Sequence, residues 1–103
     1  MTDESASGAW SFSLYVSGAS PRSAAAISTI RRLCSEDLHG DAILEIIDVY
    51  TQPALAVRDD VIATPTLVRR LPLPIHRLIG DLSDLARIRM SLGLVRPGTG
   101  TGL

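Results

Sequence analysis

The segment Ala63-Thr64-Pro65-Thr66-Leu67 restricts the backbone more than any other part of this sequence. The ring of Pro65 removes one backbone donor and disfavours the helical region for the residue before it. Because β-branched threonines flank the proline and apolar residues follow, we expect an extended chain that enters a β-strand. Within this segment only the Thr64-Pro65 bond is a candidate for the cis form, which costs about 0.5–1 kcal/mol before proline.

The N-terminal half predicts a strand, a helix and a second strand. Residues 12–16 alternate and are rich in strand formers, whereas residues 21–37 carry apolar side chains at helical spacing. Ser20 can cap this helix, and the proline after it suits the first helical position. Residues 43–49 are almost all apolar, which is typical of a central strand covered on both faces. Parallel pairing of the two strands through a right-handed crossover follows.

The C-terminal half predicts a short helix, two short strands and a last helix. The short helix covers residues 53–57 and is closed by an aspartate pair. Residues 67–71 and 75–79 read as strands separated by a proline-rich turn. Ser83 can cap a final helix over residues 84–92.

The predicted order of elements is therefore strand, helix, strand, helix, strand, strand, helix. This is an α/β arrangement with the element order of a thioredoxin-like fold. A chain of 103 residues supports one hydrophobic core. We expect one domain over residues 10–94, with disordered segments at residues 1–9 and 95–103.

The chemistry of a thioredoxin-type oxidoreductase is missing. Its nucleophilic cysteine would stand at the start of the first helix, where backbone donors stabilise a thiolate, and Ser20 and its neighbours occupy that place. Cys34 is the only cysteine, so the chain has no intrachain disulfide and no dithiol cycle. Cys34 falls within the apolar pattern of the first helix, which indicates a buried structural thiol. We predict no catalytic residue and no enzymatic activity.

Metal, phosphate and cofactor sites are not expected either. His39 and His76 stand alone, with no partners at the spacing of metal ligands. The glycines of residues 98–102 lie in a terminal tail with no helix after them, so they do not form a phosphate loop.

Composition limits the cellular locations and the classes of partner that we expect for this protein. A net charge of −1 and four aromatic residues argue against binding of nucleic acid. No apolar run approaches the roughly 20 residues that span a bilayer, and residues 1–8 do not resemble a secretory signal. We therefore expect a cytoplasmic protein.

Basic residues gather around the proline-rich turn. Arg69 and Arg70 precede the turn, and His76 and Arg77 follow it. The cluster predicts either a solvated basic edge or a docking surface for an acidic protein partner.

Five groups of residues together resemble the KaiB family of circadian clock proteins, over residues 12–92. The sensor domain of the clock-output kinase SasA is a close relative of that family. The groups are Leu14-Tyr15-Val16-Ser17-Gly18 with Ser20-Pro21; Ile47-Asp48-Val49 with Pro53 and Leu55; Ala63-Thr64-Pro65-Thr66-Leu67; Leu71-Pro72 with Pro74; and Ile79-Gly80-Asp81-Leu82-Ser83.

The resemblance implies a non-enzymatic protein that docks on the hexameric ATPase KaiC, modulates its phosphorylation cycle and, where KaiA is present, sequesters KaiA. It also implies a metamorphic chain. A ground-state homo-oligomer, a tetramer or a dimer, exchanges with a thioredoxin-like monomer that binds KaiC. The part that refolds follows about residue 50, so Thr64 and Pro65 lie at its boundary.

Four positions depart from the family pattern. Ser91 and Gly93 stand where relatives often have glycine and then aspartate. Loss of a glycine within a helix removes a penalty of up to about 1 kcal/mol, and Gly93 suits a helix end, so both changes favour the thioredoxin-like form. Glu45 and Asp60 stand where cyanobacterial relatives commonly carry lysines that face KaiC. This reversal implies a KaiC relative with a differently charged face.

Two alternatives remain open at this point. One is a thioredoxin-like protein of stress or redox signalling that acts through Cys34. The other is a protein-interaction module that works with a two-component histidine kinase, in the manner of the SasA sensor domain.

Overall fold

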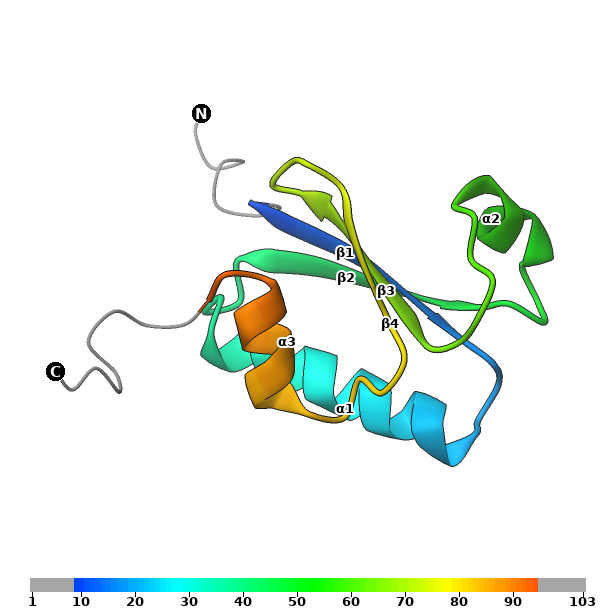
Figure 1. Cartoon of the computed structure of the whole chain (residues 1–103), viewed down its shortest axis with the longest axis horizontal. Helices are drawn as coiled ribbons and strands as arrows, with labels where there is room; N and C mark the ends of the chain where they lie inside the picture. The colour runs from blue at the N-terminus through cyan, green and yellow to red at the C-terminus, as the bar shows by residue number, and fades with distance from the viewer. Residues whose placement is uncertain (1–8, 95–103) are drawn as a thin grey trace, which may run out of the picture.

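The structure is a computed structural model that describes residues 9–94. Its elements follow the predicted α/β order (Figure 1). They are β1 (Trp10–Val16), α1 (Pro21–Glu36), β2 (Ala42–Asp48), α2 (Pro53–Arg58), β3 (Thr66–Leu71), β4 (His76–Ile79) and α3 (Leu85–Ser91). The terminal segments expected to be disordered lie outside the described residues, apart from Ala9.

The four strands form one mixed sheet in the order β2-β1-β3-β4. β1 and β2 are parallel, as predicted, and β3 is antiparallel to both β1 and β4. The prediction that residues 43–49 form a central strand is wrong, because β2 lies at an edge and β1 is central. The apolar run is misleading because Leu44 and Ile46 pack on one side of β2, while Ile47 packs on the other.

Helices cover the two faces of the sheet unequally. α1 and α3 lie side by side, and α2 stands apart from both at the other end of the molecule (Figure 1). The larger core joins α1 and α3 to one face of the sheet, through Phe12, Leu14, Val16 and Leu67 of the strands. The smaller core joins Ala56 of α2 to the other face.

Local signals explain the ends of the helices. Ser20 caps α1 as predicted, and its hydroxyl accepts a hydrogen bond from the Ser23 N–H. The prediction that Ser83 caps α3 is wrong: the cap is Asp84, whose carboxylate accepts from the Arg87 N–H. Ser83 instead donates both its N–H and its hydroxyl to Asp81, in a turn just before the helix.

Gly93 ends α3 as expected. Its φ of 74° lies in the left-handed region, which glycine enters without steric cost. The N–H of Gly93 donates to the Met90 carbonyl and the N–H of Leu94 donates to the Arg89 carbonyl. These two hydrogen bonds make a Schellman motif, which satisfies carbonyls that the helix end leaves free.

Candidate protein-docking site

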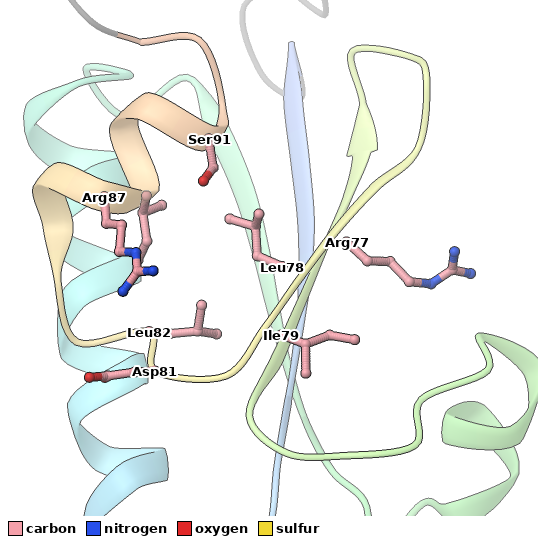
Figure 2. A pocket seen from close by; sticks show the side chains of 8 residues that line it. Arg77, Leu78, Ile79, Asp81, Leu82, Arg87 and Ser91 are labelled. Atoms are coloured by element: carbon pink, nitrogen blue, oxygen red, sulfur yellow. The ribbon is translucent and has the colours of Figure 1, made fainter.

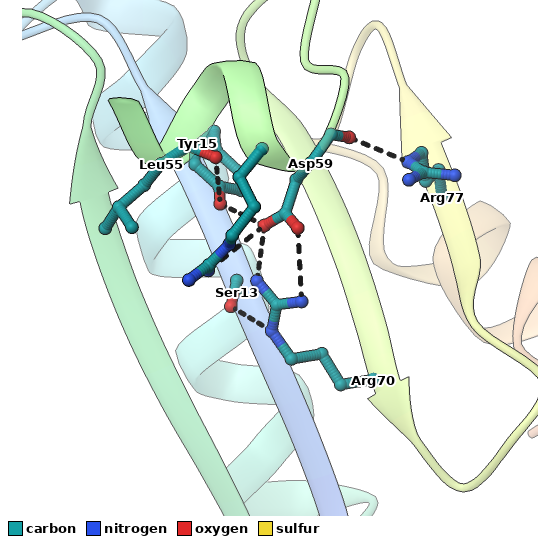
Figure 3. Close-up of polar contacts among 7 residues, drawn as sticks. Ser13, Tyr15, Leu55, Asp59, Arg70 and Arg77 are labelled. Atoms are coloured by element: carbon teal, nitrogen blue, oxygen red, sulfur yellow. Dashed lines mark hydrogen bonds and ion pairs between the residues drawn. The ribbon is translucent and has the colours of Figure 1, made fainter. Parts of the chain in front are cut away.

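A cluster of polar side chains ties the end of α2 to three strands of the sheet (Figure 3). At its centre is Asp59, the residue that follows α2, with a relative exposure of only 8%. Its carboxylate accepts hydrogen bonds from the Tyr15 hydroxyl of β1 and from the Arg70 guanidinium of β3. Arg70 also donates to the Ser13 hydroxyl at 2.8 Å, and Arg77 of β4 donates to the Asp59 carbonyl at 3.2 Å. We call these five residues the Asp59 cluster.

Charge and burial in the Asp59 cluster shift its ionisation. The hydrogen bond from Arg70 lowers the pKa of Asp59 to about 2, against the partial burial that opposes it. Burial, and then the hydrogen bond to Asp59, raise the pKa of Tyr15 above its ordinary value. At neutral pH the cluster therefore holds an ionised Asp59 beside a protonated Tyr15 and a charged Arg70.

The three arginines predicted to form one basic surface do not share one face of the sheet. Arg69 lies on the face of the helices α1 and α3, where its guanidinium sits 5.9 Å from the centre of the Trp10 ring. Arg70 and Arg77 lie on the opposite face, and Arg70 is neutralised by Asp59. Of the two, only Arg77 is classed as exposed, and its guanidinium donates to the Asp59 carbonyl.

The two acidic candidates lie on the same side of the sheet as α2. Glu45 is exposed on β2, and Asp60 is exposed directly after the Asp59 cluster, with a φ of 57°. Large apolar side chains are exposed on α2 and in the segments on either side of it: Tyr50 at 76%, Val57 at 76% and Ile62 at 87%. Exposed apolar surface next to isolated charges is typical of a protein-docking region. We call Tyr50, Val57, Asp60 and Ile62 the α2 patch.

The Thr64-Pro65 bond, which is cis, lies between this patch and β3. Pro65 is buried and Thr64 is half-buried. The Thr66 hydroxyl donates to the Ala63 carbonyl at 2.6 Å across the proline. The segment thus joins a surface loop to a buried strand.

Ser91 and Gly93 lie elsewhere, at the far end of α3. Ser91 lines a pocket of about 270 Å³ between α3 and β4, together with the apolar side chains Leu78, Leu82 and Ile88. Arg87 reaches toward this pocket, whereas Arg77 and Ile79 point away from it (Figure 2). The structure therefore separates these two candidates from the α2 patch.

The remaining reactive side chains do not build a catalytic or metal site. Cys34 is half-buried against the larger core, and burial raises the pKa of its thiol. His39 is exposed and His76 half-buried. Within residues 9–94, no three His, Cys, Asp or Glu side chains gather as metal ligands, and no helix is long and apolar enough to cross a membrane.

Sequence reasoning missed Asp59, Tyr15 and Ser13 as parts of a site. Strand alternation places Ser13 and Tyr15 on one face, but the partner on that face comes from a segment 44 residues away from Tyr15. The one signal in the sequence was Arg70, a charged residue in a predicted strand. Nothing in the sequence shows that it pairs with Asp59 and not with the adjacent Asp60.

Comparison with known proteins identifies the family. The model of the KaiB domain matches residues 13–94. The chain belongs to the KaiB family. The circadian clock protein KaiB3 of Synechocystis sp. is 44% identical over 85 residues, which are 82% of this chain and 83% of that relative. The circadian clock oscillator protein KaiB of Prochlorococcus marinus is 45% identical over 82 residues, 80% of this chain and 70% of the relative.

Solved structures show that this KaiB-family chain has a thioredoxin-like fold. The N-terminal domain of Synechococcus elongatus SasA aligns over 96% of both chains with a TM-score of 0.68, at 22% identity. Mitochondrial thioredoxin 3 of Saccharomyces cerevisiae aligns over 87% of this chain and 82% of its own, with the same TM-score of 0.68, at 14% identity. At these identities the likeness concerns the fold alone.

Proposed function

We propose that this protein is a non-enzymatic clock or signalling module that docks on a KaiC-type hexameric ATPase and modulates its phosphorylation cycle. The observation that carries the proposal is the match to the KaiB family over residues 13–94, with relatives named as circadian clock proteins. A KaiA-like protein or a histidine kinase is a further candidate partner. The proposal places these encounters in the cytoplasm.

The α2 patch together with Glu45 is the surface we assign to docking. Ile62 offers the most exposed large apolar side chain, at 87%, and exposed apolar anchors supply most of the energy of protein interfaces. Glu45 and Asp60 add negative charge to the same side, so a partner with basic residues opposite them fits best. Arg77, on the same face, is the cation that such a partner would meet at the far edge of the sheet.

Fold switching is part of the same proposal. The thioredoxin-like monomer is the form expected to bind, in exchange with a ground-state homo-oligomer, and binding selects it by differential affinity. Thr64 and Pro65 would mark where the refolding part begins. Ser91 and Gly93 would shift the balance toward the thioredoxin-like form.

The test is complex formation with the KaiC homologue of the same source, in the presence of ATP. Wild-type protein should co-migrate with the ATPase on size-exclusion chromatography after hours of mixing. Ile62→Ser should weaken binding by about tenfold or more, as loss of an apolar anchor does.

Met90→Ser is the matched control, because Met90 is also exposed, at 70%, but lies on α3 away from the α2 patch. It should bind like the wild type. Absence of any complex at micromolar concentrations, or equal binding by both variants, would count against the proposal.

A further inference from the structure

The two edges of the sheet carry opposite charge. Residues 41–50, which contain the edge strand β2, include three acidic residues and no basic residue. Residues 66–79, which contain β3 and the edge strand β4, include three arginines and no acidic residue. The edge strand β2 is therefore acidic, whereas the edge strand β4 carries one arginine, Arg77, and no acidic residue; the other two arginines belong to the inner strand β3.

One charge from each edge strand lies at the same height on the same face; the Arg77 guanidinium also donates to the Asp59 carbonyl through Nε. The strand register places Glu45 beside Ser13, Ser13 beside Val68, and Val68 beside Arg77. One cross-strand row thus begins at Glu45 on β2 and ends at Arg77 on β4. Within residues 9–94, neither side chain forms an ion pair.

Isoleucines surround both charges in the same pattern. Ile43 and Ile47 stand two residues to either side of Glu45, and Ile75 and Ile79 stand two residues to either side of Arg77. Ile43, Ile75 and Ile79 are 52%, 52% and 55% exposed, whereas Ile47 is buried under α2. The two edges therefore match as apolar, charged, apolar, with opposite signs in the middle.

Strand direction allows the two edges to meet. β1 is parallel to β2, and β4 is antiparallel to β3, which is itself antiparallel to β1, so β4 runs in the same direction as β2. A second copy in the same orientation places its β2 parallel to β4 of the first. In that register Glu45 meets Arg77 and Ile43 meets Ile75, whereas Ile47, buried under α2, brings only its backbone beside Ile79.

We propose that the thioredoxin-like form associates with further copies of itself head to tail, by pairing the β2 edge of one copy with the β4 edge of the next. Pairing of like edges in full register is disfavoured, because it sets Glu45 against Glu45 or Arg77 against Arg77. Since the contact joins two different edges, it leaves one free edge at each end and continues into longer assemblies.

The inference goes beyond the proposed function and needs no other protein. A pair of short edge strands buries little area compared with a stable dimer, so we expect association only at high concentration. This contact is distinct from any ground-state oligomer, whose mass would stop rising at a fixed number of copies.

Sedimentation velocity over a range of concentrations tests the proposal. The weight-average mass of the wild type should rise continuously up to about 1 mM, where small interfaces of this kind associate. Glu45→Arg and Arg77→Glu should each weaken association by about tenfold or more, because each sets like charges together. In the wild type, amide shifts that depend on concentration should be confined to residues 42–48 and 75–79.

An equimolar mixture of the two single variants should recover association, since every junction in a mixed assembly again joins opposite charges. The double variant Glu45→Arg/Arg77→Glu should associate by itself, without a second protein in the sample. Arg31→Glu, an equal change of charge on the exposed side of α1, should behave like the wild type. Three results would each overturn the proposal. The wild type could stay monomeric up to about 1 mM, the mass could stop at one fixed oligomer in all variants, or the mixture could fail to recover association.

Discussion

At the scale of single residues, Asp59 connects the end of α2 to three strands of the sheet. It receives donors from β1, β3 and β4, although it belongs to none of these strands. Removing one partner of a buried ion pair is costly because the other charge stays buried and unpaired. The Asp59 carboxylate therefore contributes, beside the smaller core, to the contact between α2 and the sheet.

We predict a pH dependence that is specific to Asp59. Its pKa in the folded protein is about 2, below the ordinary value of 3.8, so its stabilisation is present above pH 4 and is lost as the pH falls toward 2. The shift corresponds to stabilisation on the order of 2 kcal/mol. Asp59→Asn should lower the free energy of unfolding by a similar amount at pH 7 and flatten its decline between pH 4 and 2, as measured by urea denaturation.

Asp60→Asn is the matched control, because Asp60 is the adjacent residue and its side chain is exposed. It should leave both the stability at pH 7 and the pH dependence nearly unchanged. Equal effects of the two variants would show that the Asp59 cluster does not contribute as described.

At the scale of elements, α3 is a short helix held at both ends. Its start is capped by Asp84, and its end is closed by Gly93. Arg89 makes hydrogen bonds of 2.8 and 2.9 Å to the two carboxylate oxygens of Asp37, which caps the end of α1. Paired bonds of this kind fix orientation as well as distance. Ile88 of α3 is buried in the larger core, so this core contact and the pair with Asp37 together position the helix.

Gly93→Ala should destabilise the protein by about 1 kcal/mol, the ordinary cost of a left-handed conformation for a residue with a β-carbon. The cost is purely conformational, because an added β-carbon meets no atom within 4 Å. Gly93→Asn should cost less, since asparagine tolerates this region of backbone space. Native-state hydrogen exchange of the α3 amides, together with urea unfolding, measures both; equal stability of the alanine variant and the wild type would contradict the assignment.

The elements also show which parts of the fold the sequence could predict. The start of α1 follows from Ser20 and Pro21, which are local signals, and it was predicted correctly. The place of β2 in the sheet was not predicted correctly. An apolar run indicates that both faces of a strand are buried, but it does not indicate how many strands lie beside it. The Asp59 cluster was missed for a related reason: it depends on contacts between segments far apart in the chain, which no periodicity encodes.

At the scale of the whole molecule, the packing of Cys34 against the larger core indicates a structural thiol and not a redox sensor. Cys34 packs against the larger core, and burial raises the pKa of its thiol, which lowers the fraction of reactive thiolate. We predict that a thiol reagent at neutral pH modifies Cys34 much more slowly in the folded protein than in 6 M guanidinium chloride, by a factor of at least about ten. The rate should rise in variants that loosen the core, such as Leu33→Ala.

Immediate modification of the folded wild type would instead favour the alternative role in redox signalling. The reagent 5,5′-dithiobis(2-nitrobenzoate) gives the rate by absorbance. A Cys34→Ala variant, which has no thiol, supplies the blank.

The opposite charges of the edges β2 and β4 also contribute an electric dipole that lies in the plane of the sheet. The net charge of −1 does not reveal this dipole, because a sum of charges does not show where the positive and negative charges lie. A dipolar molecule is turned by the field of a charged partner before contact, and salt screens that field over about 10 Å at 0.1 M. The rates at which this protein meets charged partners will therefore depend on ionic strength as those of a charged protein do.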